Sequence, residues 1–133
     1  MTTVLFACVH NAGRSQMAAA LFNQLADSKK AHAISAGTEP GSRVHPEVVT
    51  AMNEIGIDIS GATTTKLTDA VARQAQILIT MGCGDQCPLV PGAQRDDWPL
   101  DDPKNQPIEK VRAIRNEIER RVKGLIKTHG FSE

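Results

Sequence analysis

The stretch from Val4 to Met17 constrains the fold more than any other part of this chain. It begins as an apolar run that ends in Cys8, continues through a short loop and restarts with the spacing of a helix. Five residues separate Cys8 from Arg14, so the loop can curl around one tetrahedral anion with the sulfur beneath it and the guanidinium beside it. The helix that follows adds unpaired N–H groups and the positive end of its dipole, which favour negative charge. We therefore interpret the stretch as an oxyanion-binding loop between a strand and a helix.

Cys8 is the candidate nucleophile of this loop, because backbone amides and a guanidinium stabilise a thiolate over a thiol. Asn11 and Gly13 suit converging amides, since both tolerate left-handed or otherwise unusual backbone angles. Ser15 can donate to the sulfur and also cap the helix. The alternative is a buried structural cysteine near a surface arginine, since Cys-x5-Arg alone recurs by chance. The predicted anion-binding residues are Val9, His10, Asn11, Ala12, Gly13, Arg14 and Ser15.

Composition narrows the class of protein. The 133 residues predict a single domain over 1–133 that buries roughly two-thirds of its unfolded surface. Lys and Arg number 15, as do Asp and Glu, so we expect neither nucleic acid nor a membrane as partner. No apolar run approaches about 18 residues and the start lacks the layout of a signal peptide, which predicts a cytoplasmic protein. Three cysteines in a reducing compartment favour catalytic or redox chemistry over structural disulfides.

The rest of the chain alternates strands with helices. Apolar runs predict strands at 3–7, 32–35 and 77–80 and a short fourth strand around Trp98. Helices are expected after the loop to about residue 25, from Pro46 to a stop at Gly56, over 67–74, and from about Pro107 onward. In the last helix, the side expected to be exposed carries Arg112, Arg115, Glu119 and Lys123. This alternation predicts an α/β fold, a doubly wound sheet of four parallel strands flanked by helices, with ligands at the carboxyl ends of strands.

Two further groups lie in loops that reach the same edge of the predicted sheet. Asp101 and Asp102 precede Pro103, and a carboxyl group there could act as a general acid, although Asp and Pro also favour turns for local reasons. Cys83 and Cys87 follow the third strand, so three thiols could converge. A zinc site would need four ligands and no His or second pair lies nearby, which leaves two surface thiols or a disulfide relay.

These motifs resemble the low-molecular-weight tyrosine phosphatase family and, within it, the thioredoxin-coupled arsenate reductases. The resemblance covers most of the chain. The matching segments are 8–18, Ser35-Ala36-Gly37, Ile57-Asp58-Ile59-Ser60, Cys83 and Cys87 with Pro88, and Asp101-Asp102-Pro103.

The resemblance implies an enzyme of arsenical resistance and detoxification that reduces arsenate to arsenite. Cys8 would attack arsenic while Asp102, directly before Pro103, protonates the departing oxygen. Cys83 would then attack the Cys8 sulfur and release arsenite, and Cys87 would attack Cys83 and move the disulfide to the surface for thioredoxin. No bound cofactor or metal is implied, and the loop would also accept phosphate or sulfate.

Several alternatives remain beside this interpretation. Some relatives space the two loop cysteines more widely, which affects the order of the relay. Others bind potassium through acidic side chains, but Ala19 and Thr65 occupy the corresponding positions, so no potassium requirement is expected. A small thiol or a glutaredoxin-like protein could replace thioredoxin. A phosphatase would use the same loop, although the chain has Lys104-Asn105 and no Tyr where phosphatases place aromatic residues. A non-catalytic oxyanion sensor is the third possibility.

Overall fold

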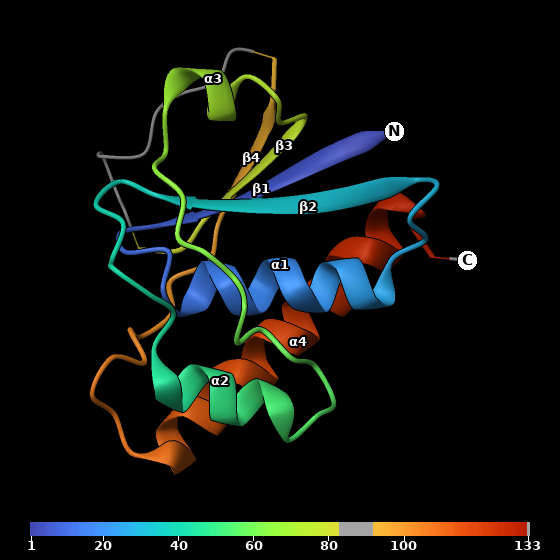
Figure 1. Ribbon diagram of the computed structural model, residues 1–133. Coiled ribbons are helices and arrows are strands. Elements are labelled where there is room, and N and C mark those ends of the chain that lie inside the picture. The colour runs from blue at the N-terminus through green and yellow to red at the C-terminus, as the bar shows by residue number, and fades with distance from the viewer. Residues whose placement is uncertain (83–91, 133) are drawn as a thin grey trace.

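The computed structural model describes residues 1–82 and 92–132, which form a parallel sheet with helices on both faces (Figure 1). The strands are β1 (Thr2–Cys8), β2 (Ala31–Gly37), β3 (Ile77–Thr80) and β4 (Gln94–Asp97), and the helices are α1 (Arg14–Leu25), α2 (Pro46–Asn53), α3 (Asp69–Ala72) and α4 (Ile108–His129). The strand order is β2-β1-β3-β4 and every pair is parallel. Helices α1, α2 and α4 lie on one side of the sheet and α3 lies on the other (Figure 1). The predicted four-stranded α/β fold is therefore confirmed.

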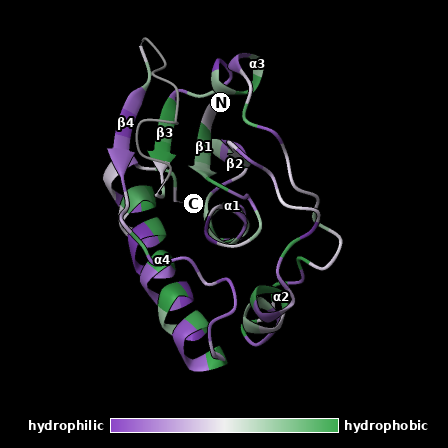
Figure 2. Ribbon diagram, turned by 90° about the vertical axis from the view of Figure 1, so that its left-hand side faces the viewer, coloured by the Kyte–Doolittle hydropathy of each residue, from purple (hydrophilic) through white to green (hydrophobic). Residues whose placement is uncertain are grey.

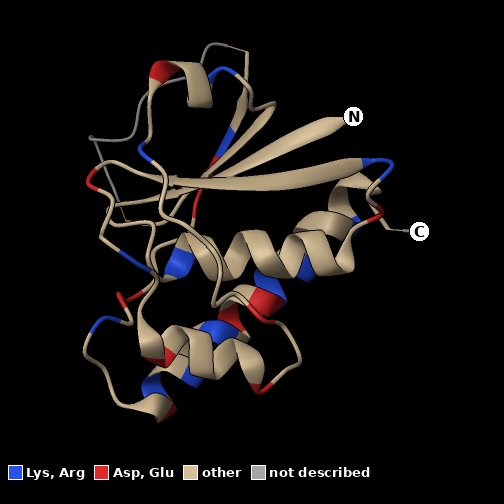
Figure 3. Cartoon of the chain, in the orientation of Figure 1, with Lys and Arg blue, Asp and Glu red and all other residues tan. Residues whose placement is uncertain are grey.

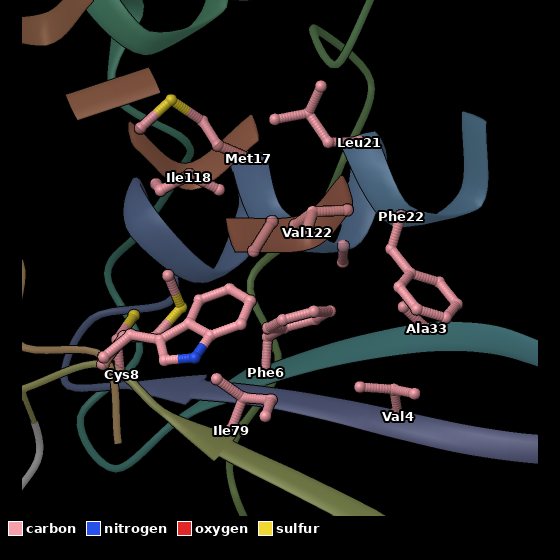
Figure 4. Packing of buried hydrophobic residues seen from close by; sticks show 14 of the residues in the cluster. Val4, Phe6, Cys8, Met17, Leu21, Phe22, Ala33, Ile79, Ile118 and Val122 are labelled. Carbon is pink, nitrogen blue, oxygen red and sulfur yellow. The ribbon is translucent and has the colours of Figure 1, made fainter. Parts of the chain in front are cut away.

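The central strand β1 supplies both cores through the alternation of its side chains. Val4, Phe6 and Cys8 point toward α1 and belong to the larger cluster (Figure 4), whereas Leu5 and Ala7 belong to the smaller cluster on the α3 side. All five are buried, which is why this strand is a continuous apolar run rather than an alternating one. A fully buried side chain such as Phe6 contributes about 1.5–3 kcal/mol to folding. This burial holds Cys8 in a fixed place at the strand end.

The edge strand β4 was predicted around Trp98, and its bounds differ from that prediction. The strand ends at Asp97, directly before Trp98, and all four of its residues are exposed and hydrophilic (Figure 2). Trp98 instead continues the ladder with one hydrogen bond, from its N–H to the carbonyl of Thr80 at 2.8 Å, and packs its ring 5.6 Å from that of Phe6. Because the strand has no buried face, it lacks the apolar pattern by which strands are recognised.

Two helices also differ from expectation. Helix α3 covers four residues instead of 67–74, since the Thr68 hydroxyl caps it and the chain turns again after Ala72. Helix α4 was expected to expose Arg115, but this residue is only 8% exposed. Its guanidinium donates to the carbonyl of Ala51 at 2.7 Å and to Glu54 at 2.9 Å. An arginine can occupy such a position because its aliphatic methylene groups pack against apolar neighbours while its guanidinium donates hydrogen bonds to polar groups.

Charged residues are spread over the molecule without segregation by sign (Figure 3). Within the described part of the chain, no helix combines the length and the apolar character needed to cross a lipid bilayer. The carboxyl ends of all four strands meet at one edge of the sheet, because the strands are parallel. Cys8 and Gly37 are register partners there, and Thr80 is the partner of Ala7 in the neighbouring strand. Segments distant in sequence thus meet around Cys8.

Glu54 links α2 to α4 and generates a prediction about acid stability. Its carboxylate accepts hydrogen bonds from Arg112, at 2.6 and 3.0 Å, and from Arg115. The Arg112 hydrogen bond is the main cause that lowers the pKa of Glu54 from 4.5 to about 2. Because the folded pKa lies below the unfolded one, the stabilisation is complete above about pH 4.5 and is lost as pH falls toward 2.

We therefore expect Glu54→Gln to lower the melting temperature at pH 7 and to differ less from the parent at pH 3. Thermal unfolding followed by circular dichroism at the two pH values measures this. Glu119→Gln is the control. Like Glu54→Gln, it removes one negative charge, here from α4, but it breaks none of the ion pairs found among the described residues. If Glu54→Gln lowered the melting temperature equally at pH 3 and pH 7, the ion-pair explanation would be contradicted.

Candidate active site

The thiol of Cys8 lies at the end of β1, where it is 2% exposed. Its Sγ atom accepts a hydrogen bond from the backbone N–H of Asn11 at 3.3 Å and lies 2.9 Å from the hydroxyl of Ser15. The Asn11 side-chain amide donates to that hydroxyl oxygen at 2.8 Å. The oxygen is therefore already an acceptor, and its own proton remains to be donated to sulfur. Two donors are therefore directed at the sulfur from within the loop and the first turn of α1.

The carbonyl groups of the loop all bond outward, away from the position above the sulfur. Those of Cys8, Val9, His10 and Ala12 accept N–H groups from the segment 38–45, at 2.8 to 3.2 Å. The carbonyl of Gly13 accepts the first hydrogen bond of α1, and that of Asn11 accepts a side-chain amide from α1. In a planar trans peptide, the N–H group points opposite to the preceding carbonyl. The amides of 9–14 therefore face inward, as the predicted anion-binding loop requires.

The backbone angles and roles of Asn11, Gly13 and Ser15 agree only in part with the sequence prediction. Asn11 has the predicted left-handed backbone, with φ at 51°. Gly13 has the other unusual backbone allowed by the prediction, with φ at −143° and ψ at −90°, and its lack of a side chain also serves a close contact. A Cβ atom on Gly13 would lie 2.7 Å from the ring of Pro103. Ser15 lies inside α1 and binds sulfur, whereas Gly13 takes the N-cap position, so the expected cap by Ser15 was wrong.

Arg14 opens α1 and is held at the rim of the loop. Its Nη1 atom donates to the carbonyl of Leu100 at 3.0 Å, and its Nη2 atom lies 3.8 Å from the Asp102 carboxylate. A guanidinium has five N–H donors, so these contacts leave others for an anion. Gly82 leaves the space that this position needs, since a Cβ atom there would lie 2.5 Å from Nη1. The sequence prediction missed the roles of Leu100 and Gly82, because neither a backbone carbonyl nor an absent side chain forms a motif.

The two aspartates before Pro103 are in different environments. Asp101 pairs with Lys110 at 2.7 Å, and this hydrogen bond lowers the pKa of the Asp101 carboxyl. Asp102 faces Arg14, and its other oxygen accepts the N–H of Lys104 at 3.0 Å. Its side chain is 40% exposed, so it can exchange protons with solvent. The contact between Pro103 and Gly13 holds this loop against the anion-binding loop.

Next to the loop lies a cleft of about 290 Å³ that carries several basic side chains. His10, Arg43, His45 and Lys104 line it, together with one acidic residue, Glu47. The Nδ1 atom of His10 lies 3.1 Å from the carbonyl of Glu39, a partner that requires Nδ1 to carry a proton. His10 is therefore tied to the loop edge and is not a freely exposed side chain.

Cys83 and Cys87 lie outside the described residues, so their predicted convergence on Cys8 stays a prediction. The last described residue before Cys83 is Gly82, and Gly82 lies close to the Arg14 side chain. Within 1–82 and 92–132, no three His, Cys, Asp or Glu side chains are grouped closely enough to hold a metal ion.

Known proteins share the sequence pattern and the fold of this chain. The profile of the family described as low molecular weight phosphotyrosine protein phosphatase matches residues 3–130, and the chain belongs to this family. It is 39% identical over 129 residues to a glutaredoxin arsenate reductase of Synechocystis sp., covering 95% of this chain and 97% of that protein.

Two solved structures show the same architecture. A thioredoxin-dependent arsenate reductase from Corynebacterium glutamicum superposes with a TM-score of 0.83 at 44% identity. The match covers 96% of this chain but 61% of that one, so the present chain spans under two-thirds of its length. An arsenate reductase in a phosphate-binding state gives a TM-score of 0.83 at 37% identity, covering 96% and 98% of the two chains.

The contact between Gly82 and Arg14 leads to a testable prediction. Gly82→Ala should weaken the binding of inorganic phosphate about tenfold or more, because the added methyl group displaces the guanidinium and a lost charged hydrogen bond is worth about 1.5–3 kcal/mol. Isothermal titration calorimetry measures the affinity.

Gly56→Ala is the matched control for backbone strain. Gly56 has φ at 81°, close to the 94° of Gly82, but a Cβ atom there would meet nothing within 4 Å. Both variants should lose about 1 kcal/mol of stability from the strained backbone, and only Gly82→Ala should lose phosphate affinity. Equal affinities in the two variants would show that Gly82 does not position Arg14.

Proposed function

We propose that this protein reduces arsenate to arsenite, with Cys8 as the nucleophile and thioredoxin as the source of reducing equivalents. The observation that carries the proposal is the Cys8 thiol at the floor of a loop whose carbonyls all turn outward. Such a loop suits a tetrahedral oxyanion. The names of the related proteins support arsenate as the oxyanion that is turned over.

The first step uses groups from the described residues. The thiolate of Cys8 forms a bond to arsenic, and one arsenate oxygen leaves as water after it is protonated. Arg14 holds two of the remaining oxygens in its planar fork, and the inward amides of 9–14 stabilise the negative charge. Ser15 and Asn11 donate hydrogen bonds to the sulfur that attacks arsenic.

Asp102 is the proposed general acid. It lies beside Arg14 and is partly exposed, so a proton can reach it from solvent. Asp101 is engaged by Lys110, which lowers its pKa and favours the carboxylate that cannot donate a proton. Proton donation to a leaving group typically accelerates a reaction by about 10²–10⁴-fold.

The second half of the reaction is a disulfide relay through Cys83 and Cys87. The Cys83 thiolate attacks the Cys8 sulfur, the S–As bond breaks, and its electron pair reduces arsenic(V) to arsenic(III), which leaves as arsenite. Cys87 then attacks Cys83 and frees Cys8, and the Cys83–Cys87 disulfide is reduced by the thioredoxin dithiol. No bound cofactor enters this scheme, and it assumes a reducing cytoplasm. The position of Gly82 beside Arg14 supports the relay, since the loop starts at the site.

A phosphatase is the second candidate, and the family profile is the observation that favours it. Cys8, Arg14 and Asp102 would serve phosphate ester hydrolysis equally well, with water instead of Cys83 resolving the intermediate. A non-catalytic sensor would bind the anion without turnover.

One assay separates these functions: arsenate-dependent oxidation of NADPH in the presence of thioredoxin and its reductase. We expect sustained oxidation by the parent protein and none by Cys8→Ser, because serine cannot form the thiol adduct at neutral pH. Hydrolysis of an aryl phosphate without arsenate reduction would support the phosphatase, and binding without either reaction would support the sensor.

The same assay with the loop variants tests the relay. Cys83→Ser should stop with an arsenic adduct on Cys8, and Cys87→Ser should complete one round and then hold a Cys8–Cys83 disulfide. Mass spectrometry of alkylated, digested protein identifies these species. Turnover at the parental rate by the double variant Cys83→Ser, Cys87→Ser with thioredoxin alone would exclude the relay.

The assignment of the acid is tested by comparing two isosteric variants. Asp102→Asn should slow arsenite formation by about 100-fold and flatten its pH dependence, because an amide cannot supply the proton. Asp101→Asn should change the rate much less, since its carboxylate is paired with Lys110. Rapid-quench measurement of arsenite in a single turnover gives both rates. The reverse ranking would assign the acid to Asp101.

A further inference from the structure

Gln16 contacts the anion-binding loop through hydrogen bonds that the proposed reaction leaves unexplained. The residue lies in the first turn of α1 and is 6% exposed. Its Nε2 atom lies 3.0 Å from the carbonyl of Asn11, 3.2 Å from the Asn11 side-chain oxygen and 2.9 Å from the carbonyl of Thr63. One amide group with two N–H hydrogens thus serves three oxygens on two separate segments.

Gln16 supplies the hydrogen-bond donor for the loop carbonyl that accepts no backbone N–H group among the described residues, that of Asn11. The other carbonyls from Cys8 to Gly13 accept backbone N–H groups, and only that of Asn11 accepts a side chain. Asn11 is fully buried and has a left-handed backbone, which asparagine tolerates better than most residues with a side chain. Without Gln16, the Asn11 carbonyl would lose the partner that holds it outward.

Gln16 also fixes the orientation of the Asn11 side chain. The Asn11 oxygen accepts from Gln16 and from the backbone N–H of Thr65 at 2.8 Å, so both of its lone pairs are used. Its amide nitrogen must then face Ser15, which keeps the Ser15 proton available for the Cys8 sulfur. Thr65 in turn accepts the N–H of Gly37 at the end of β2.

We propose that Gln16 is a positioning residue that sets the reactivity of Cys8 and the anion affinity of the loop by holding Asn11 in place. It does so as a hydrogen-bond donor. A glutamine at this helix position often uses its side chain to accept the N-cap N–H group, but here the nitrogen is directed at carbonyl oxygens. The inference rests on the proposed function only in taking Cys8 as the reactive thiol.

The test removes the donor while keeping the shape. Gln16→Met should raise the midpoint of the pH dependence of Cys8 alkylation by iodoacetamide by about one pH unit, since sulfur loses well-placed donors. Gln16→Met should also raise, by about tenfold, the phosphate concentration that protects half of Cys8 from alkylation. Mass spectrometry of the Cys8 peptide measures both, so the other thiols do not interfere and arsenate is not needed.

Asn23→Ala is the matched control. Asn23 is another α1 amide with hydrogen bonds outside the helix, at 2.7 and 3.0 Å with Ala33 of β2, but it makes no hydrogen bond to the loop. It should lower the melting temperature without moving the alkylation midpoint. If Gln16→Met does not fold, Gln16→Asn replaces it, because its amide is one methylene too short to reach all three oxygens and should shift the midpoint in the same direction.

A folded Gln16 variant with the parental midpoint and the parental phosphate protection would overturn the proposal. Arsenate turnover by the parent, measured on the same preparation, keeps this outcome apart from a failure of the proposed function. A parent without turnover whose Gln16 variants still shift the midpoint would refute the arsenate reductase assignment and leave Gln16 as a positioning residue.

Discussion

The left-handed turn at Asn11 is the constraint on which the rest of the site depends. It reverses the loop so that its backbone N–H group reaches the Cys8 sulfur, while its side chain links Ser15, Gln16 and Thr65. The carbonyls on either side of it bond outward to the segment 38–45. A single unfavourable backbone conformation thus turns a row of amides toward one point. Its energetic cost is offset by hydrogen bonds from three separate parts of the chain.

The parallel sheet explains why those parts meet. Because all four strands end at the same edge, the connections that follow β1, β2, β3 and β4 begin at the same end of the molecule. Gly37 and Gly82 are two points at which these segments approach closely. A Cβ atom on Gly37 would lie 2.5 Å from the carbonyl of Val9, and one on Gly82 would lie 2.5 Å from Arg14. The absence of side chains at the strand ends is therefore part of how the loop and its arginine are packed.

The sequence was sufficient for those features that depend on local pattern. The apolar run of β1, the cysteine at its end and the arginine that opens α1 follow from pattern and spacing, and the left-handed Asn11 follows from the residue type. The exposed strand β4 was misplaced, because it buries no face and has no apolar period. The burial of Arg115 and the donor role of Gln16 were not predictable, since each depends on carbonyl oxygens from distant segments.

The central claim is that the loop from Val9 to Ser15 holds a tetrahedral anion directly above Cys8, and a crystal structure with inorganic phosphate tests it most directly. The account predicts phosphate oxygens within hydrogen-bond distance of the inward amides and of two nitrogens of Arg14, with the Cys8 sulfur below the phosphorus. Phosphate bound instead in the neighbouring basic cleft of His10, Arg43, His45 and Lys104, with the loop empty, would contradict it.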